Sequence, residues 1–273
     1  MVQKFATPFF GQVVPFSLKS GSQFRPGPPE PVGSVGYVNQ VREILTYSAL
    51  LTDVQKVIAE YWADGPNSEL PPGHWALFSQ FVSRRDSHGV DEDVKMFFAV
   101  SGAVLDAAIV AWDAKRAFDY VRPVTAVHFL YSGQLVPAWA GPGLGTQMIL
   151  GETWQPYQAP TVVTPPFAEY VSGHSLFSSA AAAILRSYTG SDVFGHSVTI
   201  GAGSSRVEPG LVPASDVTLS WATFTDAADE AAISRRYGGI HFVEGDLRSR
   251  AAGLQVGASA WNKAQKYFNG TAN

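Results

Sequence analysis

The chain has 273 residues, of which 46% are hydrophobic and 15% charged, which allows a large packed core and excludes a disordered composition. Its net charge of −4 disfavours a nucleic-acid-binding surface, so any cationic cluster must be local. Cysteine is absent, which excludes disulfides, thiolate metal sites and cysteine nucleophiles. We find no signal peptide and no run apolar enough to span a membrane, and therefore expect a soluble protein of undetermined compartment.

In chain order, apolar spacing and helix-breaking residues predict a mostly helical protein. Residues 1–33 are rich in Pro, Gly and Ser and predict an extended arm. Residues 34–265 predict a helical domain, and residues 266–273 a tail. Within the domain, helices are expected over 36–62, 74–82, 91–120, 173–188, 226–236 and 245–263. The first of these ranges is expected to be broken near residues 51–52. Residues 189–222 predict a long loop with a short hairpin. The fold class is therefore all-α, a helical bundle with long functional loops.

A first polar cluster lies at the end of the longest predicted helix. In KRAFDYVRP, Lys115 and Arg122 are seven residues apart, which in a continuous helix places them on one face. Asp119 lies between them and is expected to fix their directions. Alone, this pattern equally suits a surface helix with an internal ion pair.

Two further clusters follow. Ser172, Gly173 and His174 open an alanine-rich helix, whose free backbone N–H groups and positive dipole end suit an anion. Arg235 and His241 flank a pair of glycines that ends another predicted helix. Alone, each cluster also suits ordinary helix capping. Together, the three clusters predict an oxyanion pocket.

In this order and spacing the clusters resemble the signature shared by vanadium-dependent haloperoxidases and type-2 phosphatidic-acid phosphatases. The matching residues are Lys115, Arg122-Pro123, Ser172-Gly173-His174, Ser234-Arg235 and His241. The stretches 51–75, 106–126 and 235–246 are similar to the haloperoxidase branch. The resemblance implies the helical-bundle fold of that family. Those proteins are usually longer, so the chain is expected to be their catalytic half.

The resemblance also implies roles for these residues. The cofactor would be vanadate, for which phosphate can substitute in a crystal, and His241 would be the protein ligand to vanadium. His174 would act as acid and base, and Lys115 would polarise the bound peroxide. The vanadate oxygens would be bound by Lys115, Arg122, Ser172, Gly173, His174 and Arg235. The family's acid four residues after the last histidine is replaced by Gly245, so Glu244 or Asp246 would support His241.

Trp112 and Phe167 match positions that line the halide pocket in chloroperoxidase-type members, although plain core packing also explains them. The expected substrates are hydrogen peroxide and a halide, bromide and iodide before chloride. We expect no nucleic-acid or membrane partner. A homo-oligomer, or a second chain that supplies the missing N-terminal helices, is expected because apolar helices would otherwise stay uncovered.

Two alternatives remain open from the sequence. The first is an acid phosphatase that uses the same pocket, with His241 as nucleophile and His174 protonating the leaving group. The second is a non-catalytic helical module that binds an anion or a partner protein.

Overall fold

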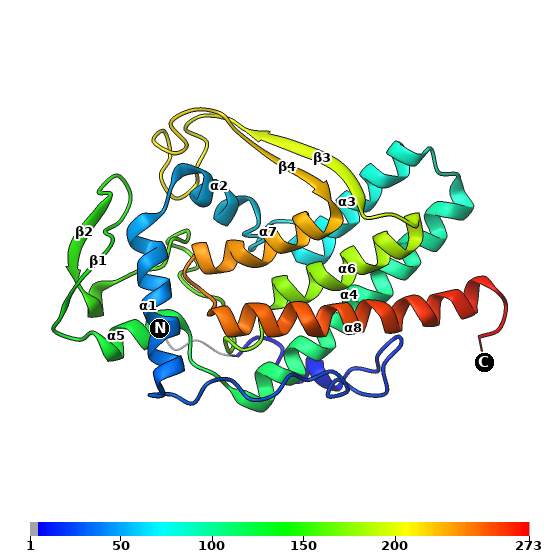
Figure 1. Cartoon of the computed structure of the whole chain (residues 1–273), viewed down its shortest axis with the longest axis horizontal. Helices are drawn as coiled ribbons and strands as arrows, with labels where there is room; N and C mark the ends of the chain where they lie inside the picture. The colour runs from blue at the N-terminus through cyan, green and yellow to red at the C-terminus, as the bar shows by residue number, and fades with distance from the viewer. Residues whose placement is uncertain (1–4, 273) are drawn as a thin grey trace.

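A computed structural model of the chain describes residues 5–272 and is a bundle of helices with two antiparallel hairpins (Figure 1). The predicted all-α class is confirmed. The long helices α4 (Val90–Phe118), α6 (Gly173–Thr189) and α8 (Val243–Phe268) pack side by side, and α7 (Phe224–Tyr237) lies against α6. Helix α6 is the centre of the bundle because it contacts α3, α4, α7 and α8.

Small residues allow α6 and α8 to lie close together. A Cβ atom on Gly253 would come within 2.7 Å of the Leu176 carbonyl oxygen, and one on Gly257 within 2.7 Å of Ala183 Cβ. Ala180 and Ala181 on α6 are completely buried. The alanine-rich sequence of α6 is therefore required by packing, and it holds the N-terminus of α6 in a fixed position.

The helices that precede α4 follow the sequence prediction. Helix α1 spans Val35–Leu50 and α2 spans Asp53–Tyr61, and the break between them falls where it was predicted. Thr52 marks this break as the N-cap of α2, because its hydroxyl oxygen accepts a hydrogen bond from Gln55 N and its own backbone N donates one to Gln55 Oε1. Helix α3 runs over Leu70–Asp86, longer than predicted at both ends.

The end of α4 differs from the prediction. The helix stops at Phe118, because Asp119 adopts a left-handed backbone with a φ of 44°. Arg122 then caps a separate short helix, α5 (Pro123–Leu130). The prediction that Lys115 and Arg122 share one helix face is wrong, since a turn separates them.

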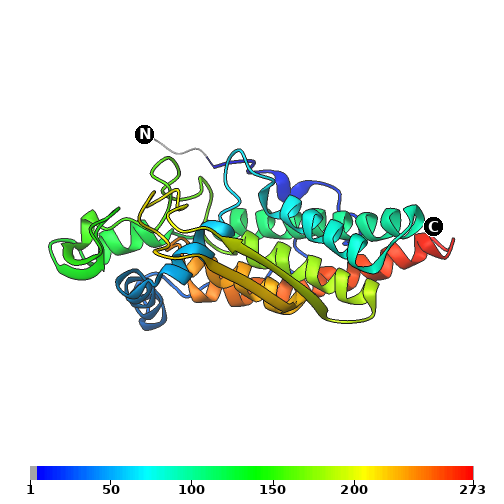
Figure 2. The same ribbon diagram turned by 90° about the horizontal axis from the view of Figure 1, so that it is seen from above.

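Two hairpins complete the structure. The expected hairpin pairs β3 (Val193–Ile200) with β4 (Val217–Thr223) and forms a long ribbon along one side of the bundle, over α2 and α7 (Figures 1 and 2). A second hairpin, β1 (Leu135–Trp139) with β2 (Thr146–Leu150), packs on α1 and was not predicted. The short 3-10 helices η1 (Phe10–Gln12) and η2 (Gly151–Thr153) lie in the connecting segments.

The described part of the N-terminal arm lies along α4 and is fixed by carboxylates. Asp106, which is fully buried, accepts hydrogen bonds from Phe16 N at 2.6 Å and Ser17 N at 2.8 Å. Arg25 forms a bidentate ion pair with Asp113. Residues 1–4 of the predicted arm and residue 273 of the predicted tail lie outside the described residues. Helix α8 continues to Phe268, within the segment predicted as tail.

One stretch of the described chain, from Val90 to Leu130, is long and apolar enough by composition to cross a membrane. This corrects the sequence-based expectation that no run would qualify. In the apolar 18-residue window that identifies this stretch, 56% is buried inside the protein. The main part of the stretch is α4, the helix that packs against α6 and α8. Its apolar character is therefore explained by its place in the core.

Candidate active site

The three predicted clusters meet at one end of the bundle core. Lys115 lies in the last turn of α4, Arg122 at the start of α5, and His174 in the first turn of α6. Arg235 lies in the last turn of α7, and His241 follows in the loop to α8. One direct contact joins two of them: Arg122 Nη1 lies 3.2 Å from His241 Nε2, and it also donates to the Ile240 carbonyl at 2.7 Å. Residues separated by more than 100 positions thus share one buried site.

His241 is oriented by Glu169, a residue that the sequence analysis missed. His241 Nδ1 donates to Glu169 Oε1 at 2.7 Å, and Phe242 N donates to the same oxygen at 3.0 Å. Burial and the charges of Arg122 and Lys115 hold the pKa of His241 well below its usual range. The imidazole is therefore neutral, with Nε2 as its unprotonated nitrogen, which is the form that binds a metal.

Gly245 explains why the acid comes from elsewhere in the chain. A Cβ atom at position 245 would lie 2.3 Å from Glu169 Oε1, so any side chain there would displace the Glu169 carboxylate. The position four residues after His241, where the family often has an acid, therefore carries no side chain here. The carboxylate that contacts His241 belongs instead to Glu169, in the segment before α6. Burial raises the pKa of Glu169 to about 7, although Arg122 and Lys115 partly oppose this shift.

Three predicted supporting residues lie elsewhere. Glu244 accepts from Glu30 N and Arg248, and Asp246 accepts from Arg250 and Ser175, so neither contacts His241. Both are in the first turn of α8, where carboxylates favour the helix N-terminus. Asp119 is exposed at the end of α4 and does not fix Lys115 or Arg122. The predictions that Glu244 or Asp246 supports His241 and that Asp119 orients the two cations are therefore wrong. Asp246 still lies behind the anion site, because Ser175 also contacts Ser172.

Backbone carbonyl groups hold the three cations of the site. Lys115 Nζ donates to the carbonyls of Ala168 at 2.9 Å, Glu169 at 3.0 Å and Val171. Arg122 Nε donates to the Phe167 carbonyl at 2.9 Å. Arg235 Nη2 donates to the Ala59 carbonyl at 2.9 Å, and Nη1 to the Ala63 carbonyl at 3.4 Å.

The two arginines keep buried N–H donors that no protein acceptor satisfies, whereas the three donors of Lys115 are all used. Burial lowers the pKa of Arg122 and that of Arg235 to about 10, and it lowers the pKa of Lys115 well below the usual value. Within residues 5–272, Arg122 Nη2, Arg235 Nε and His174 Nε2 are buried and have no hydrogen-bond partner. Unpaired buried donors on cationic groups are costly, and an oxyanion would satisfy them. The residues present therefore fit vanadate or phosphate.

The N-terminus of α6 supplies the remaining donors. Ser172 is the N-cap, and its hydroxyl oxygen accepts from Ser175 N at 3.4 Å and from Ser175 Oγ at 2.9 Å. Gly173 follows as the first helical residue, and a Cβ atom there would contact only Phe177, at 3.4 Å. Protein packing alone therefore does not demand glycine at this position. Ser175 N is used by this cap, whereas the N–H groups of Gly173 and His174 have no protein acceptor in the described chain and can bind an anion.

His174 is paired with a second missed residue, Asp64. Asp64 Oδ2 lies 3.8 Å from His174 Nε2, and Asp64 Oδ1 accepts from His74 Nδ1 at 3.0 Å. Burial raises the pKa of Asp64, but His74, His174 and Arg235 outweigh it and hold this pKa below its usual range. Burial and Arg235 lower the pKa of His174 to about 3, against the opposite effect of Asp64.

Trp112 and Phe167 lie together next to the cations. Their ring centroids are 5.0 Å apart, and the Phe167 ring lies 5.0 Å from Lys115 Nζ and 5.2 Å from the Arg122 guanidinium. Trp112 also donates to the Ala6 carbonyl and contacts Phe10, so part of its position is explained by the arm. Phe167 is the ring that forms an aromatic wall beside the two cations.

Comparisons with known proteins agree with this geometry. The family model described as the vanadium chloroperoxidase (VCPO) second helical-bundle domain matches residues 95–270. The apo and holo structures of a bacterial vanadium-dependent chloroperoxidase superpose with TM-scores of 0.89 and 0.88, at 31% identity over 98% of this chain. A bacterial vanadium-dependent iodoperoxidase gives a TM-score of 0.74, at 28% identity over 95% of this chain. Curated protein sequences give no significant match.

The chain spans 56–58% of the length of these three solved structures. The family match covers well over half of the chain, and it includes Lys115, Arg122, His174, Arg235 and His241. The chain therefore belongs to the vanadium haloperoxidase family, as a second helical-bundle domain.

Proposed function

We propose that the protein is a vanadate-dependent haloperoxidase, which uses hydrogen peroxide to oxidise a halide to hypohalous acid. The observation that carries the proposal is the combination of unpaired donors on Arg122 and Arg235 with an unprotonated His241 Nε2. Arg122, Arg235, Ser172 and Gly173 would bind the oxygens of vanadate, and His241 would be its protein ligand. Bound vanadate would supply Lewis-acid polarisation of a peroxide oxygen.

The protein's own groups have distinct roles in this reaction. Glu169 keeps the His241 proton on Nδ1, so that Nε2 faces the ligand. His174 exchanges protons with the reacting oxygen, as a general acid and base. Lys115 contributes positive charge, but in this structure its ammonium group already donates to three carbonyls. Its first effect is therefore to fix the segment 168–171 that carries Glu169.

The halide preference is a finer part of the proposal. Phe167 and Trp112 would form the weakly polar side of the halide pocket, where an anion is held after it loses water. Bromide and iodide are easier to oxidise than chloride. We therefore assign bromide and iodide as substrates, with chloride oxidised at acidic pH.

The same geometry carries one other candidate function. His241 Nε2 is unprotonated and lies among phosphate-binding cations, which is also the arrangement of a phosphatase nucleophile. A vanadate titration separates the two functions: vanadate should activate a haloperoxidase and inhibit a phosphatase. Stoichiometric vanadate that abolishes phosphate-ester hydrolysis, and gives no bromination with peroxide, would establish the phosphatase instead.

The assembly is proposed from the same comparisons. The relatives are longer, and several large apolar side chains of this chain are exposed, among them Phe129 at 76% and Leu135 at 61%. We propose a homo-oligomer, or a partner chain that supplies helices equivalent to the remainder of the relatives. Hydrogen peroxide and halide would be the small-molecule substrates.

A further inference from the structure

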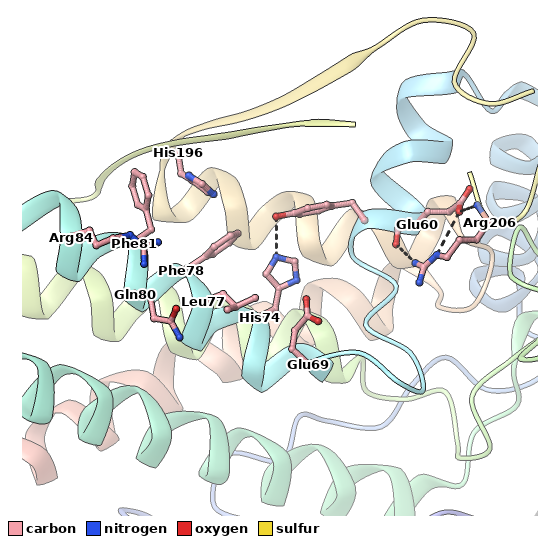
Figure 3. A pocket seen from close by; sticks show the side chains of 11 residues that line it. Glu60, Glu69, His74, Leu77, Phe78, Gln80, Phe81, Arg84, His196 and Arg206 are labelled. Carbon is pink, nitrogen blue, oxygen red and sulfur yellow. Dashed lines mark hydrogen bonds and ion pairs between the residues drawn. The ribbon is translucent and has the colours of Figure 1, made fainter. Parts of the chain in front are cut away.

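A cavity of about 460 Å³ lies beside the active site, between α3 and the β3–β4 ribbon (Figure 3). Its wall includes the rings of Tyr61, His74, Phe78, Phe81 and His196, and the carboxylate of Glu69. The site residues Lys115, Arg122 and His241 do not line it. One side chain of the wall, His74, extends from the cavity toward the active site.

A continuous series of polar contacts runs from this cavity to His174. His74 Nε2 lies 3.1 Å from the Tyr61 hydroxyl, and His74 Nδ1 lies 3.0 Å from Asp64 Oδ1. Asp64 Oδ2 then lies 3.8 Å from His174 Nε2, and both of these atoms are buried without another hydrogen-bond partner in the described chain. Since an ionised Asp64 only accepts, His74 Nδ1 donates to it, and His74 Nε2 accepts from Tyr61.

We propose that Tyr61, His74 and Asp64 form the proton pathway of the enzyme, which connects water in this cavity with His174. The proposal rests on the haloperoxidase function, because that reaction consumes a proton. One hydrogen peroxide, one halide ion and one proton give one hypohalous acid and one water. His174 is 16% exposed at its side chain and needs a new proton in each cycle.

Each residue of the pathway can receive a proton and pass one on. The Tyr61 oxygen takes a proton from cavity water as the hydroxyl gives its own to His74 Nε2. His74 Nδ1 then releases its proton to Asp64 Oδ1, which makes Asp64 a neutral carboxylic acid. Rotation of this carboxyl group turns its O–H toward His174, and the proton passes to His174 Nε2 across the 3.8 Å gap, directly after a small approach or through one water, which restores the Asp64 carboxylate. No other bond is made or broken. His74 returns to its starting tautomer when Nε2 loses its proton to cavity water and Nδ1 gains one from water.

The pathway can be tested in the vanadate-free protein, independently of halogenation. With ¹⁵N-labelled histidine, NMR measures how fast the ring protons of His174 exchange with water. We expect His74→Gln and His74→Ala to slow this exchange by about tenfold or more, because a relay group is lost. Imidazole should restore fast exchange in H74A, because it can occupy the vacated space beside the cavity.

H74Q distinguishes a relay from a positioning role. A glutamine amide can still donate to Asp64 and contact Tyr61, but it cannot take up one proton and release another. Wild-type exchange in H74Q would therefore overturn the pathway. His196→Phe is the matched control, because His196 lines the same cavity and contacts Phe81 but does not contact Asp64 in the described part of the chain. If H196F slowed exchange as much as H74Q, the proposal would also fail.

The two proposals fail in different ways. Halogenation with normal His174 exchange in H74Q would refute the proton pathway and leave the haloperoxidase function intact. Slow exchange in H74Q without any halogenation by the wild-type protein would support the pathway and refute the function. In an active enzyme, H74Q should lower kcat by about tenfold at unchanged vanadate affinity.

Discussion

Replacing Glu169 by glutamine should weaken vanadate binding through His241 alone. Glu169 Oε1 accepts one hydrogen bond from His241 Nδ1 and one from Phe242 N. Glutamine has the same size and keeps an oxygen at this position, so His241 should retain its orientation. The variant loses only the negative charge that makes the His241 Nδ1 bond strong and Nε2 a good ligand.

The size of the effect follows from this limited change. Loss of a group that supports a metal-binding histidine typically costs 10–100-fold in metal affinity, which is about 1.4–2.7 kcal/mol. The carboxylate must be ionised for the difference to appear, and burial raises the pKa of Glu169 to about 7. The difference in vanadate affinity between the wild-type protein and E169Q should therefore be largest above pH 7. It should shrink as the pH falls below 7, where Glu169 in the vanadate-free protein is already neutral.

Equilibrium dialysis against vanadate at pH 6 and pH 8 measures this difference directly. Glu244→Gln is the matched control, since Glu244 is the acid nearest to His241 in sequence but binds Glu30 N and Arg248 instead. E244Q should bind vanadate with wild-type affinity at both pH values. Equal affinity of E169Q and the wild-type protein at pH 8, or a larger loss in E244Q, would refute the reasoning.

Four other predictions concern the same site and its surroundings. His241→Ala should abolish vanadate retention on gel filtration, whereas His174→Ala should retain vanadate and lose about 10²–10⁴-fold in turnover; the opposite pattern would exchange their roles. Burial lowers the pKa of His174 to about 3, so below pH 6.5 the unfolded chain binds a proton that the folded chain does not. The free energy of unfolding of the vanadate-free protein should therefore contain a His174 contribution that falls by about 1.4 kcal/mol per pH unit from pH 6.5 toward 3, and denaturant titrations of His174→Gln should lack it. Phe167→His and Trp112→Phe should change the ratio of bromide to chloride turnover, and an unchanged ratio in both would mean that these rings only pack. Light scattering should show an oligomer, or a complex with a second chain, and a stable active monomer at micromolar dilution would contradict the proposed assembly.

The cations and histidines of the site could be predicted from the sequence because each lies near the end of a helix. Neighbouring residues such as serine and glycine indicate where these helices begin or end. Ser172-Gly173 marks the start of α6, and Gly238-Gly239 marks the end of α7. Local signals of this kind survive in a single sequence. The helices were predicted for the same reason, and the break at Thr52 is the clearest case.

The partners of the histidines could not be predicted in this way, because they come from distant segments. Glu169 is 72 positions from His241, and Asp64 is 110 positions from His174. Proximity in sequence to His241 favoured Glu244 and Asp246, but these carboxylates lie in the first turn of α8, where they stabilise the N-terminus of the helix. One signal was available: Glu169 is a single acid in the apolar run before Ser172. The end of α4 was also missed, because nothing in the sequence near Asp119 requires a left-handed residue.

The anchoring of the cations by carbonyl groups has a consequence for the choice of anion. Within the described chain, Lys115, Arg122 and Arg235 are held by peptide oxygens and form no direct ion pair with a carboxylate. An incoming oxyanion therefore displaces no acidic side chain, and its entry requires little rearrangement. Such a frame is equally receptive to any tetrahedral oxyanion, phosphate included. If the protein binds vanadate as proposed, discrimination between vanadate and phosphate would depend on coordination by His241 Nε2. The ratio of vanadate to phosphate in a cell would then decide how much of the protein carries vanadate.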